Sequence, residues 1–181
     1  MGGEDTGWEV GEVVLTSQPM AHVISASHRA KICHQCWTCI EEGQGKMCGC
    51  GVIVYCGDQC HAEGRLEHQS ECSIDGLEDL PDKLLLLLRI WLRLQEGEVK
   101  EEDGIGRCRR WSDLEDHWQE LEVEAGHLLD ILHKQLVAAV GEQVRRVTTY
   151  NRETLSKVAP NRTNFGKIWG AMQTNSFSLR W

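Results

Sequence analysis

The sequence contains no long apolar run. Its longest leucine cluster, Leu84–Leu88, has five residues and is flanked by charged side chains, whereas a membrane-spanning helix needs about 18. The first 30 residues begin with acidic side chains and hold no continuous apolar segment of the kind found in a secretory signal peptide. We therefore expect a soluble protein of a reducing compartment, in the cytoplasm or the nucleus, without a membrane partner.

Positive charge is also scarce. The chain has 19 lysines and arginines against 28 aspartates and glutamates, with a formal net charge of −9. Between residues 33 and 72 the fixed cations are Lys46 and Arg65, opposed by six carboxylates. A protein that binds nucleic acid needs a positive surface to displace counterions from phosphate. Nucleic acid is therefore not expected as a partner, and a DNA-binding regulator is the disfavoured class.

Motifs of familiar catalytic sites are absent. There is no P-loop, no Ser/His/Asp order and no paired-carboxylate arrangement, and the sequence has no internal repeat. The histidines outside residues 33–72 show no ligand spacing with one another, and Cys108 is expected to be an ordinary thiol. No catalytic residue is therefore predicted from these patterns.

What the sequence does contain is a dense set of metal-ligand side chains. These eight residues are Cys33, Cys36, Cys48, Cys50, Cys56, Cys60, His68 and Cys72. A segment of this size has too few large apolar residues for a core of its own, so it needs disulfides or metal ions. The closing histidine favours metal, because imidazole binds zinc and cannot form a disulfide. Eight ligands fill two closed tetrahedral sites, and we predict two structural zinc ions.

Disulfides are the alternative explanation of the cysteines. They would require an oxidising compartment, for which the N-terminal residues carry no signal. Nine cysteines would also leave one thiol unpaired in any scheme made only of disulfides. Metal binding is the interpretation that the composition favours.

The remaining pattern predicts a mainly helical α+β fold. Short strands are expected at 13–15, 22–24 and 51–55, and helical turns at 57–71. A helix should begin near Pro81 and end near Gly97, followed by a charged loop over 96–106. Ser112–Glu115 has the form of a capping box that opens a further helix.

Two apolar stripes complete the pattern. The first has helical spacing and is expected to lie in the core; it consists of Leu129, Leu132, Leu136, Val140 and Val144. After Pro160, the spacing of Phe165, Ile168, Trp169 and Met172 predicts a final amphipathic helix.

The ligand spacing resembles that of the MYND zinc finger. The resemblance implies that ligand pairs alternate between two metals, with Cys33, Cys36, Cys56 and Cys60 on one zinc and Cys48, Cys50, His68 and Cys72 on the other. The flanking segments are similar to the SET and MYND domain family of protein-lysine methyltransferases. They are EVGEVVLTSQPMAHVIS (9–25), LLLLLRIWLRLQ (84–95), DLEDH (113–117) and WGAMQTNSFSL (169–179).

This second resemblance implies a domain organisation and a cofactor residue. Residues 1–32 would be partial SET-like strands, 33–72 the MYND finger, and 73–181 a helical region like the insert of the SET fold, ending at the start of the SET core. Asn175 matches an asparagine that lies near the methyl donor S-adenosylmethionine in the family.

The sequence departs from the family at three places. The middle ligand pair is C-x-C rather than C-x2-C, so Cys39 is an alternative to Cys50 as a ligand. Where many family fingers carry the Gln and Trp that line a groove for proline-rich peptides, this chain has His61 and Arg65. The glycine-rich cofactor loop, the NHSC segment and the tyrosine of the lysine channel have no counterpart in these residues.

Two functional hypotheses follow. The first is a zinc-binding protein–protein interaction module, catalytically incompetent as given, whose partners are proteins and include proline-rich peptides. The alternative is a fragment of a SET/MYND protein-lysine methyltransferase that uses S-adenosylmethionine, since methyl transfer depends on aligning the donor with the lysine amine.

Overall fold

The computed structural model describes residues 11–13, 19–72, 74, 76–96, 101–102, 108–109, 111–147 and 158–176. These residues are mainly helical, as predicted. The helices are α1 (Asp58–His68), α2 (Asp82–Glu96), α3 (Trp118–Val147) and α5 (Arg162–Asn175), with 3-10 turns η1 (Leu77–Asp79) and η2 (Trp111–Asp113). The strands are β1 (Lys46–Met47), β2 (Val54–Tyr55), β3 (Glu101–Glu102) and β4 (Cys108–Arg109). No helix in the described part of the chain is both long and apolar enough to cross a membrane.

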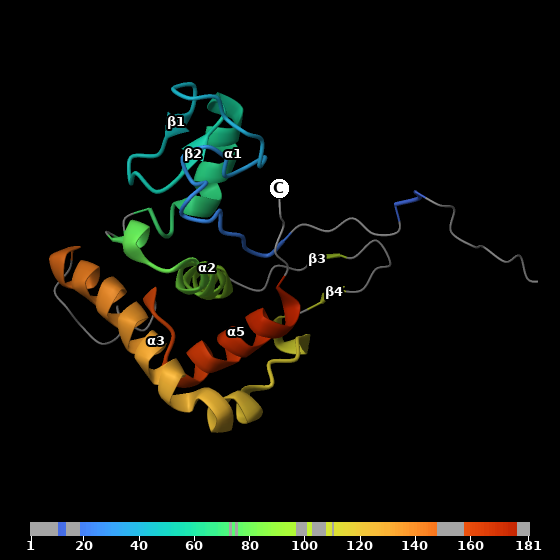
Figure 1. The fold of residues 1–181 in the computed structure, drawn as a ribbon, viewed down its shortest axis with the longest axis vertical. Helices are drawn as coiled ribbons and strands as arrows, with labels where there is room; N and C mark the ends of the chain where they lie inside the picture. Colours follow the sequence, from blue (N-terminus) through green and yellow to red (C-terminus); the bar gives the residue numbers. More distant parts are fainter. Residues whose placement is uncertain are drawn as a thin grey trace, which may run out of the picture.

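Helix α2 is the centre of the molecule. In Figure 1 the cysteine-rich module, which we define as residues 32–72, lies on one side of α2, and α3 and α5 lie on the other. Leu84, Leu87, Leu88 and Trp91 are buried, as their spacing predicted, and so are Leu85 and Ile90. A helix whose central residues are apolar on more than one face must be covered on opposite sides. This explains why α2 carries neighbours on both sides.

Helices α3 and α5 pack against each other and against α2. Leu129, Leu136 and Val140 of α3 are buried, and Leu132 is partly buried; the side chain of Val144 lies outside the described residues. From α5, Phe165, Ile168 and Met172 enter the same core, with Trp169 packed at its edge. Helix α5 begins where the side chain of Asn161 accepts a hydrogen bond from Asn164 N at 2.9 Å, an N-cap that follows Pro160.

The strand predictions hold only in part. The segment 51–55 contributes just Val54 and Tyr55, which pair antiparallel with Met47 and Lys46, because a turn with Gly51 at φ +74° precedes them. Residues 22–24 are not a strand. The carbonyl of His22 accepts from the side chain of Arg89 at 2.6 Å instead of from a neighbouring strand. Val13 is not in a strand either, and residues 14–15 lie outside the described part.

The predicted capping box at Ser112–Glu115 is wrong. Residues 111–113 form the turn η2, and α3 starts at Trp118. His117 has a left-handed φ of +46°, which separates the turn from the helix, and Trp118 N donates to Asp116 Oδ1 at 2.9 Å. Asp116 therefore provides the local acceptor at this helix start.

The loop predicted over 96–106 contains a short strand. Helix α2 continues to Glu96, and Glu101–Glu102 pairs antiparallel with Cys108–Arg109. Two residues are too few to show the alternation by which a strand is recognised in a sequence.

Candidate metal centres

The first cluster brings together Cys33, Cys36, Cys56 and Cys60. A tight turn presents the first two cysteines: Cys33 N donates to Thr38 O and Trp37 N donates to Cys33 O, each at 2.9 Å. Cys56 follows β2, and Cys60 lies in the first turn of α1. The Cys56 sulfur is 3.6 Å from that of Cys36 and 3.5 Å from that of Cys60.

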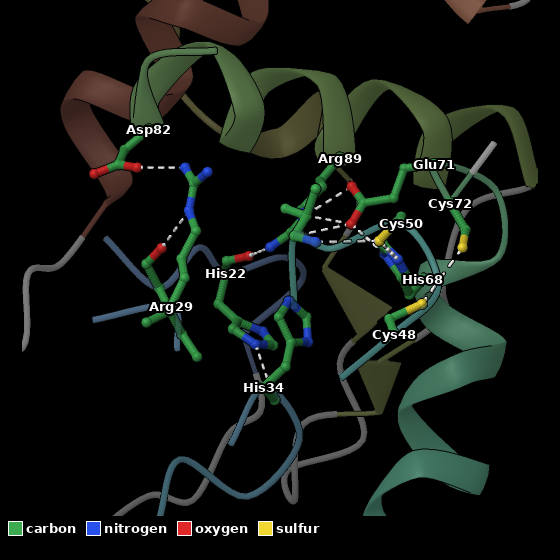
Figure 2. Close-up of polar contacts among 12 residues, drawn as sticks. His22, Arg29, His34, Cys48, Cys50, His68, Glu71, Cys72, Asp82 and Arg89 are labelled. Carbon is green, nitrogen blue, oxygen red and sulfur yellow. Dashed lines mark hydrogen bonds and ion pairs between the residues drawn. The ribbon is translucent and has the colours of Figure 1, made fainter. Parts of the chain in front are cut away.

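The second cluster brings together Cys48, Cys50, His68 and Cys72. Cys48 and Cys50 come from the turn after β1, and His68 is the last residue of α1. Cys72 N donates to His68 O at 2.9 Å, which sets Cys72 one turn further along. The sulfurs of Cys48 and Cys72 are 3.5 Å apart, and Cys50 Sγ is 3.1 Å from His68 Nε2 (Figure 2).

The geometry of both clusters fits a tetrahedral metal ion. Within each cluster all the ligand atoms lie within 4.8 Å of one another. Zinc bound at about 2.3 Å from each sulfur would place sulfur pairs about 3.8 Å apart, close to the spacings observed. One cluster offers four thiols and the other three thiols and an imidazole, and both donor sets are those of structural zinc sites. Each cluster could therefore hold one zinc ion, while occupancy itself stays a prediction.

The arrangement gives no support to disulfides. All eight cysteines whose side chains the structure describes are free. Their grouping follows the alternation of ligand pairs that the resemblance implied, with the first and third pairs in one cluster and the second and fourth in the other.

The electrostatics of the thiols also favour a cation. Hydrogen bonds that the side chain and backbone of Thr38 make to the Cys36 sulfur lower the pKa of Cys36 to about 6, because they stabilise the thiolate, which is the form that binds metal. By contrast, burial and the neighbouring Cys48 raise the pKa of Cys72 to about 12. Burial and the other cysteine sulfurs likewise raise the pKa of Cys60. Closely packed thiolates repel one another, and a divalent ion removes that repulsion because coordinated thiols lose their protons.

The structure separates Cys50 from its alternative, Cys39. Cys50 lies in the second cluster, whereas Cys39 is exposed and belongs to neither. Cys39 forms an isolated bridge with Ile32. The short C-x-C pair can converge because Cys48 N donates to Ile53 O and Gly51 N donates to Cys48 O, each at 2.9 Å. These bonds close the chain into a turn around both sulfurs.

Sequence reasoning missed the polar side chains behind the second cluster. Glu71 accepts from His68 Nδ1 at 2.6 Å, and Arg89 of α2 donates to both oxygens of the Glu71 carboxylate (Figure 2). Burial alone would raise the pKa of Glu71, but the hydrogen bond from His68 and the charge of Arg89 outweigh burial and lower it. Two features of the sequence could have indicated these residues. Glu71 follows His68 by three positions, and Arg89 is a charged residue within a leucine-rich segment.

A pair of histidines lies beside this network. His22 Nε2 donates to the carbonyl of His34 at 2.8 Å, and the two rings have centroids 4.5 Å apart. Burial, followed by the charge of Arg89, lowers the pKa of His34 to about 2. The His34 ring is therefore a neutral part of the interior.

Asn175, the residue matched to the methyl-donor site, lies at the C-terminal end of α5. Its side-chain amide donates to Ala171 O at 2.8 Å and to Glu115 O at 3.3 Å. Helix α2 separates α5 from the cysteine-rich module (Figure 1). Asn175 thus binds one carbonyl group of its own helix and one of the segment before α3, and its role toward S-adenosylmethionine stays a prediction.

Comparison with known proteins gives one partial similarity. No family model matches the chain. The chain is 26% identical over 103 residues to the human histone-lysine N-methyltransferase SMYD3, a match that covers 52% of this chain and 23% of that protein. The matched region therefore spans about a quarter of that relative's length.

Proposed function

We propose that the chain contains a MYND-type module with two structural zinc ions and that it functions in protein–protein interaction. The observation that carries this proposal is the convergence of eight ligand side chains into two clusters with alternating ligand pairs. Structural zinc sites have four protein ligands and no open position for a substrate. Ions held in this way would stabilise a surface for a partner.

The proposal extends to the organisation of the chain. Residues 33–72 would be the MYND module, residues 1–32 SET-like strands, and residues 73–181 a helical region like a SET insert. The similarity to SMYD3 supports this proposal. The hydrophobic core runs from Ile53 and Tyr55 of the module to Leu85 and Leu88 of α2, so the parts would present one continuous surface.

Proline-rich peptides are the proposed partner class, and His61 and Arg65 are the residues at which the surface departs from the family groove. The His61 ring packs edge-on against Tyr55 at a centroid distance of 5.3 Å, and Arg65 is exposed. An aromatic wall at this place would stack against a preformed polyproline helix at little entropic cost.

The double variant His61→Gln/Arg65→Trp is expected to bind a proline-rich peptide more tightly than the unmodified chain, by roughly two- to tenfold from the added aromatic contact. Isothermal titration calorimetry on the zinc-loaded protein measures the change. The matched control is His61→Gln/Arg65→Ala, which removes the same charge without adding a ring. An equal gain in the control would assign the effect to charge and contradict the groove.

The alternative function is that of a methyltransferase fragment, and the similarity to SMYD3 favours it. Calorimetry with S-adenosylmethionine discriminates between the two functions. We expect no saturable binding by this 181-residue chain, because the side-chain amide of Asn175 is already hydrogen-bonded to the carbonyl groups of Ala171 in α5 and of Glu115. Methyl transfer is not expected either, because it requires the methyl donor and the lysine amine to be aligned. Saturable binding, or radiolabel transfer to a lysine peptide, would establish the enzyme instead.

A further inference from the structure

The buried polar side chains of the described residues gather in one place. They are His34, His68, Glu71 and Arg89. His68 belongs to the second metal cluster and Arg89 projects from α2, with Glu71 between them and His34 below Arg89 in the view of Figure 2. His68 and Glu71 are each 2% exposed and Arg89 is 8% exposed. Burying a charge is costly unless it is paired and hydrogen-bonded. The cluster therefore needs an explanation beyond packing.

The hydrogen bonds form a chain from the metal cluster to the helix. His68 Nδ1 donates to Glu71 Oε1 at 2.6 Å. Arg89 Nη2 donates to the same oxygen at 2.7 Å, and Arg89 Nε donates to Oε2 at 2.7 Å. Arg89 Nη1 donates to the carbonyl of His22 at 2.6 Å. The guanidinium thus joins α2, the residues after His68 and the segment before the module (Figure 2).

The hydrogen bond between His68 and Glu71 decides which nitrogen of His68 can bind metal. An ionised carboxylate has no proton to give, so the proton in the bond to Glu71 belongs to Nδ1. The Nε2 lone pair is then available, and Nε2 is the atom 3.1 Å from Cys50 Sγ, inside the cluster. A carboxylate behind a metal-binding histidine holds the ring in this tautomer and orientation.

The ion pair between Arg89 and Glu71 explains why an arginine lies among the buried residues of α2. Glu71 is buried, and its charge is balanced by a planar guanidinium that contacts both oxygens at once. Arginine provides this forked geometry and lysine does not. Arg89 also shares one face of α2 with Leu85, and both residues line a small cavity together with Val23 and Ile53.

We propose that Glu71 and Arg89 are positioning residues of the second zinc site, and that through them metal binding at this site depends on the docking of α2. The inference rests on the proposed zinc function. It makes the two sites unequal: the Cys48–Cys50–His68–Cys72 site requires a side chain from outside the module. At the other cluster, by comparison, the hydroxyl of Thr38 lies 3.2 Å from Cys36 Sγ, and Thr38 belongs to the module itself.

The test is a metal titration of the full chain and its Arg89→Met variant. Cobalt(II) serves as the probe, because four sulfur ligands and three sulfurs with one nitrogen give different ligand-field spectra; zinc affinities follow from competition with a chelator. The variant is expected to bind metal at the second site about 10- to 100-fold more weakly. Affinity at the first site is expected to equal that of the unmodified chain.

Arg29→Met is the matched control. Arg29 also bridges to α2, through a 2.6 Å ion pair with Asp82, and its side chain is 11% exposed. It donates to the carbonyl of Ile24 and has no described contact with His68 or Glu71. The control removes a similar link between the same parts of the protein, so both sites should keep their affinity.

Two more variants separate positioning from folding. Arg89→Lys keeps the positive charge and is expected to weaken the second site less than Arg89→Met, again without change at the first. The double variant Glu71→Gln/Arg89→Met leaves no unpaired carboxylate. Because both residues act through His68, its loss of metal affinity at the second site should be smaller than the sum of the losses in Glu71→Gln and Arg89→Met.

The possible outcomes distinguish the inference from the proposed function. Unmodified protein that binds two metal ions, together with an Arg89→Met variant of unchanged second-site affinity, would overturn the inference alone. Equal weakening of both sites in Arg89→Lys, or second-site weakening in Arg29→Met as large as in Arg89→Met, would also overturn it. Unmodified protein that binds no metal would overturn the proposed function and the inference with it.

Discussion

The purified chain is expected to carry two equivalents of zinc, and Cys56→Ser and His68→Ala are each expected to carry one. Cys56 belongs to the first cluster and His68 to the second, so each substitution removes a ligand from a single site. Elemental analysis after gel filtration measures the stoichiometry. Because structural zinc supplies on the order of 10–16 kcal/mol to small modules at neutral pH, a chelator should also unfold the cysteine-rich module. Circular dichroism would record this loss of structure.

Cys39→Ser is the control for this prediction. Its thiol is exposed and lies outside both clusters, so the variant should keep both zinc equivalents. Cys50→Ser, in contrast, should lose one. The reverse result would show that Cys39 completes the second site, and an unmodified chain with one equivalent or none would contradict the two-site arrangement.

Gly170→Ala is expected to destabilise the helical region strongly, by about 3 kcal/mol, toward the upper end of the usual cost of overpacking. A Cβ atom at Gly170 would lie 1.7 Å from the carbonyl oxygen of Asp116 and 2.8 Å from its carbonyl carbon. These are backbone atoms, so no side-chain rotation relieves the clash. Helix α5 would have to move away from the segment that leads into α3. Urea unfolding of the zinc-loaded protein measures the change in free energy.

Gly126→Ala provides the comparison within the same helical pair. Its Cβ would meet nothing closer than the Glu122 carboxylate at 3.4 Å, which is an ordinary contact. Alanine in a helix interior is more favourable than glycine by roughly 0.5–1 kcal/mol. Because Gly126 directly follows the kink of α3 at Ala125 (φ −133°, ψ 15°), only part of this gain is expected, and the variant should be at least as stable as the unmodified protein. Equal stability of Gly170→Ala and Gly126→Ala would contradict the close approach of α5 to Asp116.

The parts of the fold that could be predicted are those that depend on local spacing. Leu84, Leu87 and Leu88 recur with the period of a helix, and the structure buries them. The helix after Pro160 was predicted in the same way, and Phe165 lies in its core. The start of α3 could not be predicted, because Ser112–Glu115 has the local form of a cap while the chain turns at His117 before the helix begins.

The sequence by itself determined the eight donor side chains and led to the prediction of two metal ions, because the type and spacing of the ligands can be read from one short segment. Tertiary structure decided which residues stand behind those donors. Arg89 is 18 positions from Glu71 and 67 from His22. The positions of Glu71 and Arg89 in the sequence are each notable, but they do not show that the two residues are partners. They meet because the middle of α2 is buried on both sides, and the cysteine-rich module covers the side from which Arg89 projects.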